Sequence, residues 1–393
     1  MSSPDCPWVP PSAFTSVALI GSESMRVAVG RELAASYPLL EFDLERSPGP
    51  GTTITDPNRL SEPDALIVCA SVPLTPALGA DVTGVAAAGR AVAARLRRGQ
   101  LVLLAGPVPP GTTRGVLLPP LASTGLAPGR DFGLAYLSAP TGGGTARAVG
   151  GFDEHGAVAT SALLGRAGIA TTRVSSLETA EVCGAVAPLV RAVLSATANE
   201  LKTACARMSV DAGEVIGASG VGGLLSADGV RAREPLLLAW GARRWGAPFR
   251  LFGVASDINA AVPARILSAV TGALNDAGRA VRGSRVALVG GTHITAEPPE
   301  PHLELLGLLI NKGAIVSYSD PRRPLLLPSG RGPGADPLTS QPLTPEYLGA
   351  QDCVLIASDT TDFDRIVRHS RLVVDARTVP RTTALGREKI VQA

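Results

Sequence analysis

Short, mainly apolar runs alternate with helix-like stretches along the first part of this chain, and this alternation restricts its fold more than any other feature. The runs lie at Ser16–Gly21, Leu39–Asp43, Ala65–Cys69, Leu101–Ala105 and Leu134–Tyr136. Apolar strands separated by helices are typical of a parallel sheet that helices cover on both faces. The sequence therefore predicts an α/β domain over residues 14–174.

The same alternation begins again at Arg285 and predicts a second, smaller parallel α/β domain over residues 283–393. Between the two domains, an alanine-rich helical stretch runs from Glu178 to about Met208, and a second helical block runs from Leu236 to about Asp276. These blocks predict a helical central domain over residues 175–280. The expected fold is two Rossmann-like parallel-sheet domains joined by a long central helix and a helical middle domain.

Composition excludes several classes of protein. The formal net charge is +2 and no basic block stands out, which argues against a nucleic-acid partner. The five cysteines are too scattered for a zinc site or a disulfide framework, so we expect no metal. The chain opens on a polar, proline-rich stretch rather than a signal peptide, and no apolar run approaches the roughly 20 residues that span a bilayer. We expect a soluble, cytoplasmic protein that does not bind a membrane.

Several short motifs follow one another in an order that resembles a known family. They are Ser71-Val72-Pro73, Val108–Thr113, Gly129–Phe132, Thr179-Ala180-Glu181, Asp257-Ile258-Asn259, Asp320-Pro321 and Val373–Arg377. Together they look like the UDP-glucose/GDP-mannose dehydrogenase family across nearly the whole chain. The resemblance implies an N-terminal NAD-binding domain, a central helix that mediates dimerisation and a C-terminal domain that binds the nucleotide.

The same resemblance implies a reaction, the oxidation of a sugar alcohol twice to a carboxylate, for which the family's residues are missing here. The family's lysine and asparagine on the central helix fall on Gly184 and Pro188, and its cysteine nucleophile falls on Val230. Further departures are Glu234 at the family's aspartate, Pro107 at a threonine, Ala139 at a glutamate and His293-Ile294 at a tyrosine-lysine pair. Valine cannot form the thiohemiacetal of the second oxidation. The sequence therefore predicts that sugar oxidation is lost.

The dinucleotide fingerprint is also incomplete, because only its first glycine, Gly21, survives in Gly21–Arg26. Glu23 would bring a carboxylate to the pyrophosphate, and Arg26 replaces the glycine that allows tight packing. Asp43 lies 22 residues after Gly21, where a ribose-binding acid belongs. If NAD is still bound, we expect Gly21, Asp43, Ser71 and Pro73 to contact it. The sequence leaves NAD binding open and indicates no other cofactor.

New groups are available to replace the lost ones. Arg231 and Arg233, in the loop that replaces the cysteine motif, and Arg191, on the central helix, are candidates for binding a phosphate or carboxylate of a small-molecule substrate. Glu234 and His293 are the candidate acid–base residues. The alternatives are that these arginines are solvated surface residues and that His293 lies in a plain loop.

Three functional hypotheses follow. The first is a family member repurposed as a non-redox catalyst, for example in a specialised biosynthetic pathway. The second is a non-catalytic binding or scaffold protein, and the third is a residual NAD-dependent dehydrogenase with a relocated mechanism. The resemblance implies a homodimer formed through the central helix, whereas a scaffold protein would use this helix to bind an active paralogue.

Overall fold

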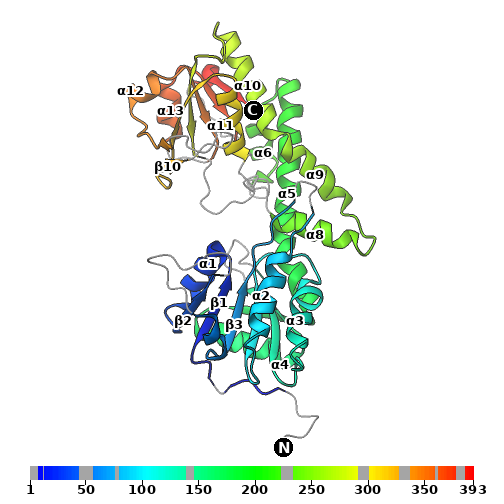
Figure 1. Cartoon of the computed structure of the whole chain (residues 1–393). Helices are drawn as coiled ribbons and strands as arrows, with labels where there is room; N and C mark the ends of the chain where they lie inside the picture. The colour runs from blue at the N-terminus through cyan, green and yellow to red at the C-terminus, as the bar shows by residue number, and fades with distance from the viewer. Residues whose placement is uncertain are drawn as a thin grey trace, which may run out of the picture. The chain divides into compact units, whose positions relative to one another are not determined.

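The protein was analysed as a computed structural model, which describes residues 8–11, 13–43, 56–75, 79–138, 146–222, 233–290, 301–326, 337–358, 362–377 and 386–393. The chain divides into two compact units, one of Met1–Leu189 with Arg233–Phe249 and one of Val190–Ala232 with Arg250–Ala393. Each unit is built on its own sheet (Figure 1). The predicted fold class is confirmed, and the helices expected over residues 175–280 are shared between the two units.

The first unit contains a seven-stranded sheet in the order β2-β1-β3-β4-β5-β6-β7. Its strands are β1 (Val17–Gly21), β2 (Leu39–Phe42), β3 (Ala65–Cys69), β4 (Leu101–Ala105), β5 (Gly133–Leu137), β6 (Arg147–Gly151) and β7 (Thr171–Val174). All neighbours are parallel except β5 and β6, which run antiparallel. The sequence predicted the parallel strands that correspond to β1–β5. β6 runs antiparallel to β5, because only residues 138–146 separate them and a crossover between parallel strands needs roughly a dozen residues or more.

Helices cover both faces of this sheet, because the side chains of each strand alternate between the two faces. α1 (Glu23–Leu33) and α4 (Glu154–Arg166) pack with one set of strand residues. α2 (Thr83–Ala93), the π-helix η2 (Thr113–Leu117) and α3 (Leu118–Ala122) pack with the other set, together with the start of α5. The carboxyl ends of the parallel strands therefore lie between two helical layers, where ligands of such folds bind.

The central helix α5 spans Leu177–Arg207 without interruption and includes Pro188. Its start is capped by Ser176, whose hydroxyl accepts a hydrogen bond from the Thr179 backbone N–H at 3.1 Å. Within the described part of the chain, α5 is the one helix long and apolar enough to cross a membrane. However, Glu181 and Asn199 are buried and hydrogen-bonded on it, which is typical of a core helix in a soluble protein.

The second unit contains a wholly parallel sheet of β14-β13-β12-β8-β9. The strands are β8 (Arg285–Val289), β9 (Ile315–Ser319), β12 (Cys353–Ile356), β13 (Val373–Asp375) and β14 (Ile390–Gln392), and β10 (Leu325–Leu326) pairs with β11 (Leu338–Thr339) beside it. α10 (Val262–Asp276) and α11 (Pro301–Asn311) pack on one face, and α12 (Pro345–Gly349) and α13 (Phe363–His369) on the other. Shorter helices α6 (Ala212–Ala218), α8 (Arg233–Arg243) and α9 (Arg250–Ala260) follow α5.

A buried lysine ties α5 to this second sheet. Lys202 is 5% exposed, and its Nζ donates to the backbone carbonyls of Arg377 at 2.8 Å and Ala393 at 2.7 Å. Burial, together with the positive charge of Arg265, lowers the pKa of Lys202 to about 7. The lysine therefore joins the helix to the ends of β13 and β14.

Candidate functional site

The loop that leaves β4 is held over the start of α5 by a tyrosine and a glutamate. Gly106 has a φ of +117°, and a Cβ there would collide with the backbone oxygen of Ala70, so only glycine fits. The buried Tyr136 hydroxyl on β5 donates to the Gly106 carbonyl at 2.8 Å. Burial raises the pKa of Tyr136, with the Glu181 carboxylate adding to the effect, so this hydroxyl keeps its proton.

Glu181 fixes the far end of the same loop. Its carboxylate accepts from the backbone N–H of Gly111 at 2.5 Å, from the N–H of Thr113 at 2.7 Å and from the Thr113 hydroxyl at 2.6 Å. Burial raises the pKa of Glu181, although these three hydrogen bonds oppose the rise. In the sequence, Glu181 stands out only as part of the Thr179-Ala180-Glu181 motif, and no local pattern there indicates this role.

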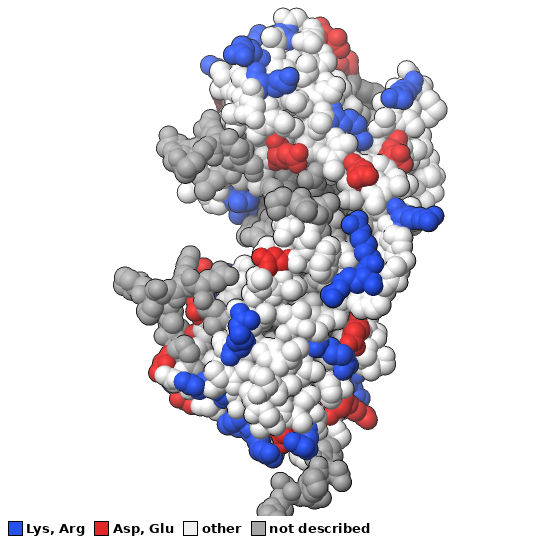
Figure 2. Space-filling view, turned by 45° about the vertical axis from the view of Figure 1, so that its right-hand side comes forward, with Lys and Arg blue, Asp and Glu red and all other residues white. Residues whose placement is uncertain are grey.

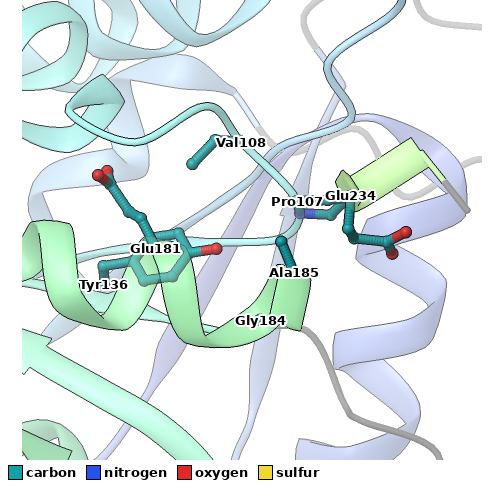
Figure 3. Close-up of a pocket in the computed structure, with 7 residues that line it drawn as sticks. All are labelled: Pro107, Val108, Tyr136, Glu181, Gly184, Ala185 and Glu234. Atoms are coloured by element: carbon teal, nitrogen blue, oxygen red, sulfur yellow. The ribbon is translucent and has the colours of Figure 1, made fainter. Parts of the chain in front are cut away.

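A pocket of about 210 Å³ opens beside this loop within the first unit (Figure 3). It is lined by Pro107 and Val108 of the β4 loop, Tyr136 of β5, Glu181, Gly184 and Ala185 of α5, and Glu234 of α8. Figure 3 shows that the carboxylates of Glu181 and Glu234 point away from each other. Much of this volume is open to solvent, and the enclosed part has room for about one water molecule.

Three of these lining residues were singled out from the sequence as positions where a polar group of the resembled family is replaced. Pro107, Gly184 and Glu234 are far apart in the sequence and meet at this one pocket. Gly184 and Pro107 have no side-chain group that can move a proton. Glu181 is committed to three hydrogen bonds. Glu234, which is half-buried, is therefore the lining residue best suited to acid–base chemistry.

The expected cofactor edge lies at the carboxyl ends of β1 and β3, where the strand order changes direction. Gly21 has a φ of +121°, and a Cβ there would lie 2.5 Å from the Cys69 carbonyl oxygen. The backbone N–H of Ser22 donates to that same oxygen at 3.2 Å. This turn is therefore bonded directly to the end of β3. The close approach of β1 and β3 therefore explains why a glycine occupies position 21.

Arg26 fills the position of the missing fingerprint glycine and is 3% exposed. Its Nε donates to the Gly21 carbonyl at 2.8 Å, and its two terminal nitrogens lie 2.9 Å from carboxylate oxygens of Glu41 and Asp43. Asp43 is thus paired with Arg26, and Glu23 is exposed at the first position of α1. These residues do not fit a bound dinucleotide, since its ribose would need Asp43 and its pyrophosphate would meet Glu23.

The other candidate residues come from separate parts of the chain. Ser71 is half-buried and Pro73 exposed after β3, and Arg191 is half-buried on α5. Arg231 and His293 lie outside the described residues, as do Val230 and Ala139, and Arg233 is described only as the first residue of α8. Across the described ranges, no group of three or more histidine, cysteine or acidic residues could hold a metal. On the face drawn in Figure 2, basic and acidic side chains are scattered among uncharged ones.

No protein-family model and no curated protein matches the chain, but solved structures do. The UDP-D-ManNAc dehydrogenase from Pyrococcus horikoshii is 20% identical, with 96% of this chain and 99% of that chain covered and a TM-score of 0.76. The UDP-glucose dehydrogenase from Pyrobaculum islandicum is 19% identical, with 98% of each chain covered and a TM-score of 0.74. The UDP-N-acetyl-mannosamine dehydrogenase from Staphylococcus aureus is 16% identical, with 96% and 97% covered and a TM-score of 0.73. This chain therefore has, over nearly its whole length, the fold of nucleotide-sugar dehydrogenases.

Proposed function

We propose that this chain is a diverged member of the nucleotide-sugar dehydrogenase family that has lost sugar oxidation and acts as a non-redox catalyst on a small molecule. The observation that carries the proposal is the pocket at which Pro107, Gly184 and Glu234 meet. These positions align with catalytic residues of the family, so their meeting at one place supports the alignment. The fold is retained while the groups at its reaction centre are replaced.

Chemistry excludes the family's oxidation at this pocket. The first step needs a base and a stabilising donor beside the sugar alcohol, and glycine at 184 and proline at 188 supply neither. The second step needs a thiolate that bonds to the aldehyde carbon. Cys183 precedes Gly184, but it packs against the hydrophobic core and is not among the residues that line the pocket. No residue at this pocket can replace the missing nucleophile.

The position of Glu234 at the pocket favours a reaction in which a proton, and not a hydride, is transferred. Glu234 lines the pocket, and a carboxylate in this position can accept a proton from a carbon or hydroxyl of a bound molecule. The same carboxyl can return the proton to a neighbouring atom, as in an isomerisation or an elimination. A non-catalytic binding protein is the runner-up, and the small size of the pocket favours it.

Two measurements test this proposal. The purified chain should form no NADH from NAD and a panel of UDP- and GDP-sugars, and steady NADH formation would overturn the loss of oxidation. Native mass spectrometry of the purified chain then identifies a co-purifying ligand, whose conversion without NAD is followed by mass spectrometry.

The variant Glu234→Gln should slow that conversion by about 100-fold or more, the usual effect of removing a general acid or base. Glu178→Gln is the matched control, because Glu178 makes an exposed ion pair with Arg114 and does not line the pocket. A ligand that binds and is never converted would favour the binding protein. Equal rates for the two variants would remove Glu234 from the mechanism.

A further inference from the structure

Arg26 is a cation enclosed at the carboxyl end of the first sheet of the protein. Only 4% of its side chain is exposed, and its Asp43 partner is exposed to 8%. The guanidinium also bonds to Glu41, whose side chain is 42% exposed, and to the Gly21 carbonyl. The planar fork of an arginine suits such simultaneous contacts, which hold it in one orientation.

These contacts lie where a dinucleotide-binding sheet holds its adenosine. In such sheets the acid that ends the second strand binds the ribose hydroxyls, and the last fingerprint glycine lets the helix pack closely against the strand. Here Asp43 follows β2, and Arg26 stands at that glycine position. The guanidinium makes with Asp43 the hydrogen bond that a ribose hydroxyl would otherwise make.

We propose that Arg26 is a built-in occupant of the adenosine subsite, and that it closes the first sheet to adenine dinucleotides. A ligand that entered would have to displace a buried guanidinium from two carboxylates and a carbonyl. Breaking one side of a buried ion pair leaves an uncompensated charge, which is strongly unfavourable. The exposed Glu23 at the start of α1 adds repulsion toward a pyrophosphate.

The proposal identifies the residue that closes the site, so removing that residue should reopen it. We expect Arg26→Gly to bind ADP-ribose and NAD at least 10-fold more tightly than the wild-type chain in isothermal titration calorimetry. Adding Asp43→Asn to that variant should abolish the gain, because the ribose-binding carboxylate is then removed. Arg31→Gly is the matched control, since it removes an exposed arginine from the same helix and should bind no better than wild type.

Circular dichroism and thermal melting show whether each variant folds. If Arg26→Gly does not fold, Arg26→Gly with Glu41→Gln leaves one fewer unpaired carboxylate and takes its place in the titration. Wild-type binding of ADP-ribose that is as tight as that of the variant would overturn the proposal. A folded variant that gains no affinity would also overturn it.

This inference can fail independently of the proposed function. If the wild-type chain binds NAD but forms no NADH with nucleotide sugars, the closed subsite is wrong and the loss of oxidation stands. If the wild-type chain forms NADH, the proposed function fails on that separate measurement, and the closed subsite fails with it because NAD must then bind the wild-type chain.

Discussion

Lys202 offers a direct test of how the core of the second unit is held together. The chain has three lysines, Lys202, Lys312 and Lys389, and of these only Lys202 is buried. Its pKa is lowered from 10.5 to about 7, mainly because burial disfavours the charged form. A neutral amine has two N–H donors, and these match its two carbonyl acceptors. Deprotonation therefore keeps both hydrogen bonds.

The sign of the resulting pH dependence follows from proton binding. Between pH 7 and 10.5 the lysine is protonated in the unfolded chain and neutral in the folded one. The unfolded state binds more protons there, so Lys202 makes the free energy of unfolding rise with pH by about 1.4 kcal/mol per unit. Since the folded group is half titrated at the start of this window, we expect about 2 kcal/mol between about pH 7 and pH 8.5.

The comparison variant is Lys202→Met, which removes this titration. The buried thiols of Cys69 and Cys353, whose pKa burial raises to about 12, act in the opposite direction at higher pH. The difference between the wild-type and variant curves, measured by urea unfolding, cancels such shared contributions. Lys312→Met, at an exposed lysine, is the matched control and should follow the wild-type curve.

The same pKa can be read directly by NMR of protein labelled with ¹³C-lysine. With three lysines there are three Cε signals, and Lys202→Met identifies the one from Lys202. We expect that signal to titrate near pH 7, as the buried amine requires. Three signals that all titrate near 10.5, with parallel unfolding curves for wild type and Lys202→Met, would refute the reasoning.

Two further changes test the first unit. Glu181→Gln puts an amide N–H against backbone donors and should lower the free energy of unfolding by about 2 kcal/mol, whereas the exposed Glu178→Gln should change it by less than about 1 kcal/mol. Equal melting temperatures for the two variants would show that Glu181 does not anchor the β4 loop. Gly21→Ala brings a Cβ to 2.5 Å from the Cys69 oxygen at a positive φ and should cost more than about 2 kcal/mol in denaturant unfolding. Gly272→Ala, in open space on α10, should instead stabilise by about 0.5–1 kcal/mol, and a loss at both glycines would contradict the argument.

Strands with a strong apolar pattern were predictable and those without one were not. β1, β3 and β4 are buried along almost their whole length, and their runs of apolar residues allowed these strands to be predicted from the sequence. β6 and β7 carry arginine, glycine and threonine, which favour no single local structure. β6 is a strand because β5 offers it an edge to pair with, and β7 pairs in turn with β6, which are properties of the assembled sheet.

The sequence by itself was enough to predict the fold class, which the structure confirms, and it carries the prediction that the oxidation chemistry is lost. A glycine at 184 and a proline at 188 lack the needed side chains in any fold, because covalent structure does not depend on packing. Only the tertiary structure brought Pro107, Gly184 and Glu234 to one pocket and paired Arg26 with Asp43. Those contacts depend on strand order and on the reach of long side chains between residues distant in sequence. No local pattern specifies which carboxylate a buried arginine will meet.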